Sequence, residues 1–570
     1  VSLNFPPRIN GRYVFSVAPR AFNHCVYLSD IVFSKFDSSL ERVGEDAFGD
    51  TPWLAAVKQN DSLIINDILY KYLGTSSTFV LPASIVKIAE GAFYGNTILR
   101  TIDMSQNNKL TTIAAYAFYN CANLSGNLTL MANVESVYNY AFANTAIENV
   151  ILHENSNLKT VGGYAFANCH YLKGVQLGSK TSSIATTAFL YDYSLEAFSI
   201  QAGAPTPYFL VYDGVLYKCG SNGVANELFA YPAGKLSAVF NVAEPVIGTR
   251  LNISTIGDYA LFFANIAALV IPDTITAISA NAAYIPGLIY VEFERPLSNI
   301  TYKLLFVDDP LAIGKYEPQY VVFNITDDVI DIPTEAENND INNFYGQNSE
   351  LRNLKTVYNR NHTKLYRDGN LLYAFDTLTA VLSVAKSSRT AQQITIPSSY
   401  SVEGSALFVK YIDAYAFFGY YLNKVVTGTD ILHIADYAFY GAVNLAVLDM
   451  KENTQVPVIY KNTFNSRFNN GLLIYILAGT TDNYISRWSD NTEINVTYKY
   501  LLESGEGIAN YVTLSNEEWN SIRYYDGAAW KTVTSDTHTE RYMVMSGYHP
   551  VPQRKGYIFM GWYDEAGRLI

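Results

Sequence analysis

Apolar residues return along this chain at a spacing of about 24 residues. Pairs of alanine and phenylalanine end at Phe93, Phe118, Phe142, Phe166 and Phe189, which gives intervals of 25, 24, 24 and 23 residues. A fixed period of this size is typical of repeat proteins, in which each repeat stacks on its neighbours. The pattern therefore predicts a solenoid, and a solenoid presents a long surface more readily than a closed pocket.

One repeat can be followed in full between Val161 and Leu177. A glycine-rich turn leads into Tyr-Ala-Phe, and Leu172, Val175 and Leu177 then follow at the spacing of a short strand that feeds apolar side chains inward. The phenylalanine is expected to fill the interior of each coil, where its burial contributes roughly 2–3 kcal/mol. The phenylalanines expected in this core are Phe22, Phe48, Phe93, Phe118, Phe142, Phe166, Phe189, Phe417, Phe439 and Phe464.

A second, longer period divides the chain. The segments Asn66–Tyr70, Asp213–Tyr217 and Asp368–Tyr373 resemble one another, and each combines strand-like runs with a polar or glycine-containing turn. This arrangement predicts β-hairpins inserted between blocks of coils. The expected hairpins lie near 66–82, 211–232 and 366–384, in blocks that cover 1–65, 66–210, 211–365 and 366–494. The repeat stops near residue 495, so 495–570 is expected to form a small β-rich region.

The coil Ile-Gly-x-x-Ala-Phe-x-x-Cys-x-x-Leu, nearly complete at Val161–Leu172 and Ile113–Leu124, resembles the BspA-like leucine-rich repeats of bacterial surface proteins. The resemblance covers residues 10–490. It implies a mainly β fold with short helical or 3-10 turns, that is, an α/β solenoid with a stacked parallel sheet, inserted hairpins and a small C-terminal β domain. Residues 541–570 resemble a partial, β-grasp-like B repeat of internalin-type proteins. The resemblance also implies export, display on the cell surface and binding to host proteins or other cells.

Composition narrows the choice of partner. Charged residues make up 16% of the chain, against about 25% in typical soluble domains, so 46 tyrosines together with Ser, Thr and Asn must carry the polar surface. Nucleic acid and anionic membranes attract clusters of Lys and Arg. A chain with a net charge of −13 and no such cluster does not fit either of them. We expect an extracellular protein or glycan as partner, a monomeric chain and no cofactor.

Apolar stretches and the start of the chain bear on its location. The longest apolar stretch, Tyr259–Ile271, has 13 residues, whereas a membrane-spanning helix needs about 20, so direct insertion into a membrane is not expected. Val1 begins without a signal peptide. We therefore interpret the sequence as a mature fragment without its export signal and wall anchor, from a protein that is extracellular and displayed on the bacterial cell surface.

Cysteine and acidic residues offer few sites for a metal. Cys25, Cys121 and Cys169 each lie three residues after a repeat phenylalanine, in a slot that other coils fill with small residues. A small buried residue is expected there, with a disulfide framework or metal ligation as the alternatives. Residues 327–340 form an acidic, Asn-rich patch without the EF-hand order of acids and glycine. A solvated loop is expected in this patch, with a calcium site as the alternative.

Catalytic motifs do not occur in the sequence. The seven histidines form no His-Glu-x-x-His motif, and neither a Gly-x-Ser-x-Gly elbow nor a phosphate-binding Gly-x-x-x-x-Gly-Lys is present. We therefore expect no enzymatic activity and assign no catalytic residue, no cofactor-binding residue and no metal ligand. A polysaccharide-acting parallel β-helix would need clustered Asp, Lys and Arg on one strand row, which the coils lack. Carbohydrate binding without cleavage stays as an alternative.

The last intervening residue of the strand motif points away from the core, because side chains alternate along a strand. These residues form an outward row that is the candidate binding face: Asp103, Thr129, Ile151, Gln176, Ser199, Val270, Glu292, Val426 and Asp449. The row is mixed in polarity, which suits a protein or glycan better than nucleic acid. The predicted function is that of a non-enzymatic adhesin for host matrix proteins, other cells or glycans. The alternative is a structural spacer that displays other domains away from the cell wall.

Overall fold

The chain folds into two compact units, Val1–Asn359 and Arg360–Ile570, and each is described by itself. The computed structural model describes residues 1–294 and 363–489, with gaps at 34–39, 45, 60, 202–206, 244–250, 280, 461, 465–471 and 478–479. Short strands at 320–323, 355–357, 501–503, 523–525 and 530–532 and two isolated positions, 339 and 342, are also described.

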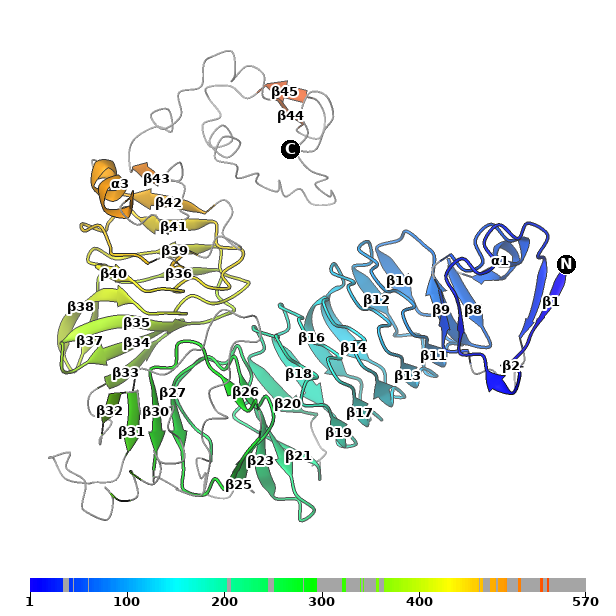
Figure 1. Cartoon of the computed structure of the whole chain (residues 1–570), viewed down its shortest axis with the longest axis horizontal. Coiled ribbons are helices and arrows are strands. Elements are labelled where there is room, and N and C mark those ends of the chain that lie inside the picture. Colours follow the sequence, from blue (N-terminus) through cyan, green and yellow to red (C-terminus); the bar gives the residue numbers. More distant parts are fainter. Residues whose placement is uncertain are drawn as a thin grey trace. The chain divides into compact units, whose positions relative to one another are not determined.

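Short parallel strands build one side of the regular coils of unit 1, and Figure 1 shows them side by side. They are β11 (Lys87–Ile88), β13 (Thr112–Ile113), β15 (Ser136–Val137), β17 (Thr160–Val161) and β19 (Ser183–Ile184). Each strand pairs with those one coil before and one coil after it, so that Ile113 lies beside Val137. The aliphatic residue of each strand is buried and the first residue is more exposed. This side of the coil therefore contributes one core residue per turn of the solenoid.

A second parallel sheet forms another side of the same coils. Its strands are β14 (Ser125–Leu130), β16 (Ala146–Leu152), β18 (Gly174–Leu177) and β20 (Ala197–Ile200), preceded by the pair β10 (Thr78–Val80) and β12 (Thr101–Asp103). Burial alternates along these strands: Leu128 and Leu130 are buried in β14, and Thr129 between them is exposed. One face of this sheet therefore supplies the core, and the other faces solvent.

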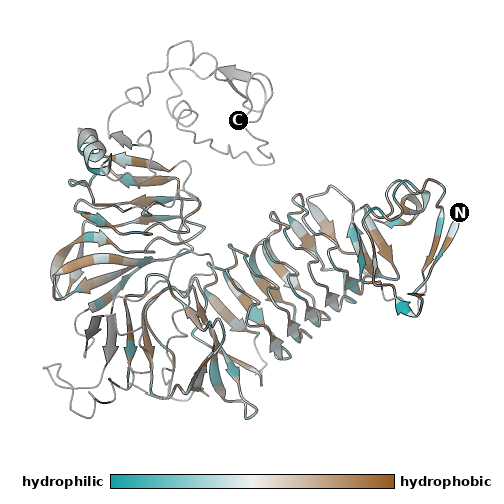
Figure 2. Ribbon diagram, viewed as in Figure 1, coloured by the Kyte–Doolittle hydropathy of each residue, from teal (hydrophilic) through white to brown (hydrophobic). Residues whose placement is uncertain are grey.

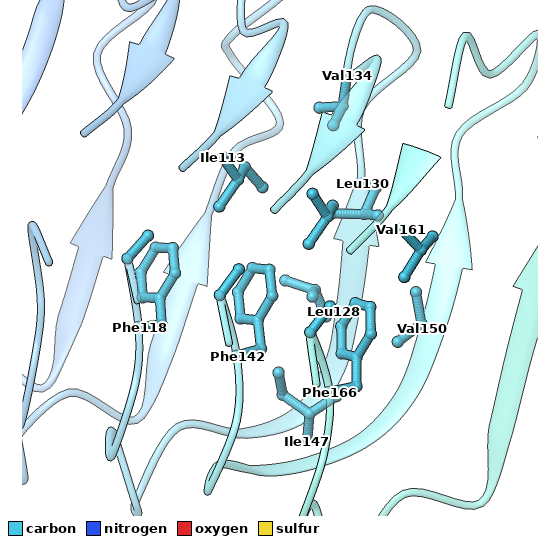
Figure 3. Close-up of a cluster of buried hydrophobic side chains, with 14 of the residues drawn as sticks. Ile113, Phe118, Leu128, Leu130, Val134, Phe142, Ile147, Val150, Val161 and Phe166 are labelled. Carbon is cyan, nitrogen blue, oxygen red and sulfur yellow. The ribbon is translucent and has the colours of Figure 1, made fainter. Parts of the chain in front are cut away.

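Between the two sheets each coil makes a turn that carries the repeat phenylalanine. The phenylalanine N–H donates to the alanine carbonyl of the next coil, at 2.7 Å from Phe118 to Ala141 and 2.8 Å from Phe142 to Ala165. Both alanines are completely buried, where a larger side chain would have to be accommodated in a close-packed interior. The rings stack in a row, with centroids 4.9 Å apart for Phe118 and Phe142 and 5.4 Å apart for Phe142 and Phe166 (Figure 3). In these coils the predicted phenylalanines from Phe93 to Phe189 thus form one row of stacked rings.

The first coils of unit 1 combine parallel pairs with hairpins and a short helix. Their elements are β1 (Ser2–Phe5), β2 (Arg8–Ile9), β3 (Arg12–Tyr13), β4 (Ser16–Val17), β5 (Asp30–Phe33), β6 (Arg42–Val43), α1 (Pro52–Val57), β7 (Lys58–Gln59), β8 (Ser62–Ile65) and β9 (Ile68–Tyr72). β1 pairs with β5 and β4 with β6 in parallel, whereas β2–β3 and β7–β8–β9 are antiparallel. Helix α1 begins after Thr51, whose hydroxyl accepts the Leu54 N–H at 3.1 Å, as N-cap threonines do.

The first predicted hairpin lies upstream of its expected position. Asn66 and Asp67 form the turn between β8 and β9, with φ values of 50° and 61°. The antiparallel partner of β9 therefore precedes it, and the strand that follows, β10, pairs in parallel with β12 instead. The hairpin expected at 66–82 is thus corrected to 62–72. Asn and Asp tolerate the left-handed backbone that a two-residue hairpin turn requires, so the sequence marks the turn but leaves open on which side its second strand lies.

The second half of unit 1 opens with an antiparallel sheet and returns to parallel stacking. Its strands are β21 (Phe209–Tyr212), β22 (Val215–Cys219), β23 (Ala225–Ala230), β24 (Ser237–Asn241), β25 (Leu251–Ile256), β26 (Leu261–Phe262), β27 (Ile266–Ile271), β28 (Ala277–Ile278), β29 (Ala283–Tyr284), β30 (Tyr290–Phe293), β31 (Tyr320–Phe323) and β32 (Lys355–Val357). Asp213 and Gly214, both at positive φ, turn the chain between β21 and β22. β23, β25 and β28 then run parallel, as do β24, β27, β30, β31 and β32.

Unit 2 repeats the same plan. Its elements are β33 (Thr363–Asp368), β34 (Leu371–Asp376), β35 (Val381–Ser387), β36 (Gln393–Thr395), β37 (Ser399–Val402), β38 (Ser405–Ile412), β39 (Lys424–Val426), β40 (His433–Ile434), β41 (Val447–Met450), β42 (Leu473–Ile476), α3 (Thr481–Ser489) and β43 (Leu501–Glu503). β33, β34 and β35 are antiparallel, and β36, β39, β41, β42 and β43 form a parallel sheet. Phe417, Phe439 and Phe464 stack at 5.2 and 5.5 Å. Trp488 of α3 lies 6.1 Å from Phe464, so this helix packs against the last ring of the stack.

The predicted fold class is confirmed: the described residues form a mainly β solenoid of stacked parallel strands with short helices. Figure 2 shows apolar residues concentrated along the strands of both units and hydrophilic residues in the β2–β3 hairpin. Near the C-terminus, β44 (Arg523–Tyr525) pairs in antiparallel with β45 (Trp530–Thr532). The acidic patch at 327–340, apart from position 339, and the B repeat predicted at 541–570 lie outside the described residues.

Candidate functional site

The first part of the predicted outward row forms a continuous line across one sheet of unit 1. Thr129 of β14 pairs with Ile151 of β16, and Gln176 of β18 pairs with Ser199 of β20. The register between β16 and β18 brings the two pairs to the same level of the sheet. Thr129 and Ser199 are exposed, and Ile151 and Gln176 are half-buried. The structure therefore brings four of the predicted residues together on an open face, which we call the outward row.

Hydrogen bonds hold the polar side chains on this face. Gln176 Oε1 accepts the Leu152 N–H at 3.0 Å, and Asn149 Nδ2 donates to Asn127 Oδ1 at 2.8 Å. A carboxamide can both donate and accept hydrogen bonds. The face can therefore offer hydrogen bonds to a partner without presenting a net charge.

Asp103 lies in a neighbouring coil, where it is exposed and paired with Val80 of β10. Its Oδ1 accepts the Ser105 N–H at 2.8 Å. Hydrogen bonds from the Ser105 side chain and backbone lower the pKa of Asp103. Asp103 therefore presents a fixed negative charge to solvent at neutral pH.

Glu292 was assigned to the outward face by its spacing, and the structure overturns that assignment. It is 1% exposed in β30, a strand whose four residues are all buried. Val270 is buried as well, in β27, where all six residues are apolar and buried. A strand covered on both faces is a continuous apolar run instead of an alternating one. The sequence Ile266–Ile271 is such a run, so the sheet has no open face here.

Asp449 is also removed from the candidate binding face. It is 7% exposed, and its carboxylate pairs with Lys424 at 3.5 Å and with Lys451 at 3.4 Å. Asp449 therefore forms ion pairs with two lysines of its own unit.

The cysteine slot lies inside the regular coils. Cys121 and Cys169 are completely buried, and Cys169 Sγ lies 3.2 Å from Thr145 Oγ1. Burial raises the pKa of the Cys121 thiol to about 12 and also raises that of Cys169. Because the thiolate is the reactive form, neither side chain is a nucleophile at neutral pH. Cys25 departs from the prediction because it is exposed in the first coil, and all four cysteines are free.

Two further properties bear on chemistry and location. Among the residues that the structure describes, no three His, Cys, Asp or Glu side chains gather into a group that could hold a metal ion. None of the helices in the described ranges combines the length and the apolar character needed to span a membrane.

A row of stacked tyrosines lies on the turn that carries the phenylalanine. Tyr116, Tyr140 and Tyr164 each precede a core phenylalanine by two residues, and their ring centroids lie 5.0 and 4.8 Å apart with planes within 7° of parallel. Tyr119 meets Tyr116 edge-on at 5.5 Å and stacks on Tyr94 at 5.2 Å. We call these five residues the tyrosine ladder. Tyr94 is 53% exposed and the other four are half-buried.

Asparagines form a second ladder beside the tyrosines. Asn144 Nδ2 donates to Asn120 Oδ1 at 2.7 Å, and Asn168 Nδ2 donates in turn to Asn144 Oδ1. All three residues adopt positive φ, between 59° and 61°, which Asn tolerates better than most residues. We call them the asparagine ladder. Sequence reasoning missed both ladders, although the recurrence of Tyr and Asn around each phenylalanine was a visible signal.

Comparison with known families identifies the repeat. Six copies of the BspA type leucine rich repeat region match residues 16–125, 104–206, 246–307 and 386–475, which together exceed half of the chain. The chain belongs to the BspA type leucine-rich repeat family. This confirms the predicted repeat family, which is consistent with a binding or surface protein. The internalin-type B repeat at 541–570 stays a prediction.

Three solved structures of bacterial proteins are similar to this chain. PcpA, a pneumococcal vaccine antigen, has 14% identity over 89% of each chain and a TM-score of 0.29. A leucine-rich repeat protein from Eubacterium ventriosum has 15% identity over 71% of this chain and 91% of its own, with a TM-score of 0.32. A leucine rich cell surface protein from Faecalibacterium prausnitzii has 14% identity over 75% of this chain and 94% of its own, with a TM-score of 0.27. No match was found among curated proteins.

The BspA-type coil is closed by a buried asparagine that sequence reasoning also missed. Asn107 Nδ2 donates to the carbonyls of Pro82 at 2.6 Å and Ile85 at 2.9 Å, and its Oδ1 accepts the N–H groups of Lys109 and Leu110. One side chain thus satisfies four backbone groups from two consecutive coils. Asn453 has a similar role in unit 2, where its Oδ1 accepts the Ile431 N–H and its Nδ2 donates to the carbonyls of Ile431 and Gln455. The sequence did not distinguish these two buried asparagines, because asparagine is also common in exposed turns.

Proposed function

We propose that this chain is a non-enzymatic binding protein of the bacterial cell surface, which presents its solenoid to a host matrix protein, another cell or a glycan. The observation that carries the proposal is the outward row, where Thr129, Ile151, Gln176 and Ser199 lie side by side on an open sheet face. The core beneath this face is fully closed, since Leu128, Val150 and Val175 are all buried. Such a face offers contact area and hydrogen bonds rather than an enclosed reaction centre.

The charge of the chain and its family support this proposal. A net charge of −13 opposes direct binding to nucleic acid or anionic lipid, and the polar groups on the face are mostly uncharged. Membership of the BspA type repeat family agrees with a role in binding. The partner of the outward row is therefore expected to be recognised by shape and hydrogen bonds.

The test is a screen of the intact chain on arrays of extracellular matrix proteins and glycans. We expect retention on at least one class of ligand. The double variant Gln176→Arg with Ser199→Arg should lose roughly tenfold or more in affinity, because burying two charged side chains in the interface costs desolvation energy. Ser183→Arg is the matched control, since Ser183 is exposed on the short-strand side of the coils. Retention on no ligand would instead favour the structural spacer.

A further inference from the structure

We propose that the tyrosine ladder and the asparagine ladder together bind a linear, uncharged polysaccharide that runs along the stack of coils in unit 1. This inference rests on the proposed function of a surface binding protein. It assigns a partner class to a surface separate from the outward row. The tyrosines and asparagines involved come from consecutive turns between Tyr94 and Asn168.

The chemistry of the two ladders matches that of sugar hydroxyl groups. A phenol hydroxyl and a carboxamide each donate and accept hydrogen bonds, as sugar hydroxyls do. Tyrosine adds a rigid aromatic body that is apolar on its ring and polar at its tip. None of the eight ladder residues is charged. A partner without charge is therefore favoured over one that carries phosphate, sulfate or carboxylate groups.

The ladders are ordered before any partner arrives. Tyr116 donates its N–H to the Asn139 carbonyl and Tyr140 to the Gly163 carbonyl, each at 3.0 Å. The stacked tyrosines adopt φ values of 56–57°, which are uncommon for bulky residues and persist where the surroundings hold them. Because the rings already support one another, binding would freeze few rotamers. A surface of this kind retains more of its contact energy as affinity.

The repeat distance of the ladder selects among linear partners. Successive rings are 5.0 and 4.8 Å apart. Side chains on one face of an extended peptide recur about every 6.6 Å. A peptide therefore loses register with the tyrosine ladder within two or three coils. One pyranose unit in an extended polysaccharide advances by nearly the ladder spacing. Sugar rings can therefore stay in register with successive coils.

One end of the ladder leaves space beside a tyrosine ring. In the coil before Tyr116 the equivalent residue is Gly91, whose N–H donates to the Ala115 carbonyl in the same rung pattern. A Cβ placed on Gly91 would meet a single neighbouring side chain, Tyr94 Cβ, at 3.6 Å. This coil therefore carries no ring at the position of Tyr116, and the space at the Gly91 Cβ position is bounded only by Tyr94 within 4 Å. We assign this opening to the first sugar ring, which would stack beside Tyr116 and Tyr94.

Charge distinguishes a neutral polysaccharide from single-stranded nucleic acid, another linear ligand that stacks on aromatic rings. Single-stranded nucleic acid also stacks on tyrosine, but it needs a groove lined with Lys and Arg for its phosphates. Glu90, next to the opening, is already paired with Arg42 at 3.2 Å. Lys71 also lies at the opening, where its ammonium donates to the Gly91 carbonyl at 3.2 Å. One lysine beside an ion pair does not make the groove lined with Lys and Arg that a polyanion needs.

The test is affinity electrophoresis of the full chain in native gels that contain hydroxyethyl cellulose or xyloglucan, with carboxymethyl cellulose as the charged comparison. We expect retardation by the neutral polymers that changes little between low and high salt, because no ion pairs are involved. Tyr116→Ala with Tyr140→Ala should weaken binding about tenfold through loss of aromatic contacts. Tyr140→Phe keeps the ring stack and should weaken it less. Tyr27→Ala is the control, since Tyr27 is 80% exposed in the first coil, outside both ladders.

Three results would overturn the inference. The first is the absence of retardation by both neutral polymers. The second is retardation that survives Tyr116→Ala with Tyr140→Ala in a variant whose circular dichroism matches the parent. The third is loss of retardation in Gln176→Arg with Ser199→Arg alone, which would place the polysaccharide on the outward row. Matrix-protein binding without polysaccharide binding would refute this inference and leave the proposed function intact.

Discussion

The repeat phenylalanine is held by its backbone as well as by its ring. Its N–H donates to the next coil, and its ring stacks between the rings before and after it, as for Phe142 between Phe118 and Phe166. At the ends of their rows, Phe189 and Phe22, which stacks on Phe48, are half-buried. The contribution of a phenylalanine to stability should therefore depend on its place in the row.

Replacement of Phe166 by alanine tests this dependence. Phe166 is 1% exposed, and emptying such a site costs about 3–5 kcal/mol because the cavity closes only in part. Phe22→Ala, at the open margin, should cost clearly less. Urea unfolding of the full chain, monitored by circular dichroism, measures both losses. Equal losses of stability for the two variants would contradict the prediction that a phenylalanine in the middle of a row contributes more than one at its end.

A buried histidine makes unit 1 sensitive to acid. His170 stacks on Tyr193 with centroids 5.6 Å apart, and burial lowers the pKa of His170 to about 4, against about 6.5 for an exposed histidine. As the pH falls from about 6.5 to 4, the unfolded chain binds a proton that the folded chain does not, so folding loses up to roughly 3 kcal/mol.

The variant His170→Gln should remove this part of the acid destabilisation. Denaturant midpoints measured at pH 7.0, 5.5 and 4.5 should therefore fall less steeply for the variant than for the parent. His153→Gln is the control, since His153 is exposed in a neighbouring coil. Identical pH profiles for parent and His170→Gln would show that His170 is charged in the folded protein.

At the scale of the element, a coil is closed by hydrogen bonds on each of its sides. The short strands, the long strands and the phenylalanine turn each bond to the next coil, and Asn107 joins the loop between them to the coil before. Two of the four backbone groups that Asn107 bonds, the Ile85 carbonyl and the Leu110 N–H, belong to buried residues, where water does not replace a lost partner. The asparagine thus stabilises the coil more than its size suggests.

Asn107→Ala is expected to cost at least roughly 2 kcal/mol, because the buried Ile85 carbonyl and Leu110 N–H both lose the Asn107 side chain. Asn108→Ala is the matched control: Asn108 is exposed, and its change should stay within about 0.5 kcal/mol. Thermal unfolding of both variants gives the comparison. Similar melting temperatures for the two would mean that the Asn107 bonds are dispensable.

The elements also show where sequence reasoning reaches its limit. Period, strand alternation and the phenylalanine core follow from local chemistry, and so does the open position of Thr129 and Ser199. The burial of Glu292 does not, because it depends on what covers a strand from outside. The sequence indicates the turn at Asn66, but it does not indicate that the strand before the turn, and not the strand after β9, completes the hairpin. The two ladders depend on contacts between coils, which a single repeat cannot reveal.

At the scale of the whole molecule, each unit has an apolar core of its own. Among the described residues, unit 1 contains three buried clusters, within Val17–Ala89, Leu69–Phe229 and Val215–Phe293, and unit 2 contains one, within Leu371–Trp488. In a repeat protein each coil contacts mainly its neighbours, so stability is distributed along the stack and local opening is favoured over global unfolding. A core defect in one unit should therefore stay local.

Hydrogen exchange followed by mass spectrometry of Phe439→Ala tests this separation. Phe439 is completely buried between Phe417 and Phe464. We expect faster exchange in peptides from 405–464 and unchanged exchange in peptides from 78–200. Faster exchange in both ranges would show that the two cores unfold together.

The shared rung pattern has a consequence for how this protein can evolve. At the phenylalanine turn, each coil accepts the N–H of the coil before it at the same alanine carbonyl, as Ala141 does for Phe118 and Ala165 does for Phe142. Duplication or loss of about 24 codons therefore joins matching interfaces and leaves the interior intact. A gain of one residue within a strand would instead exchange the inward and outward side chains. Related genes should differ in length by whole coils, and the reach of the molecule can then change without a new fold.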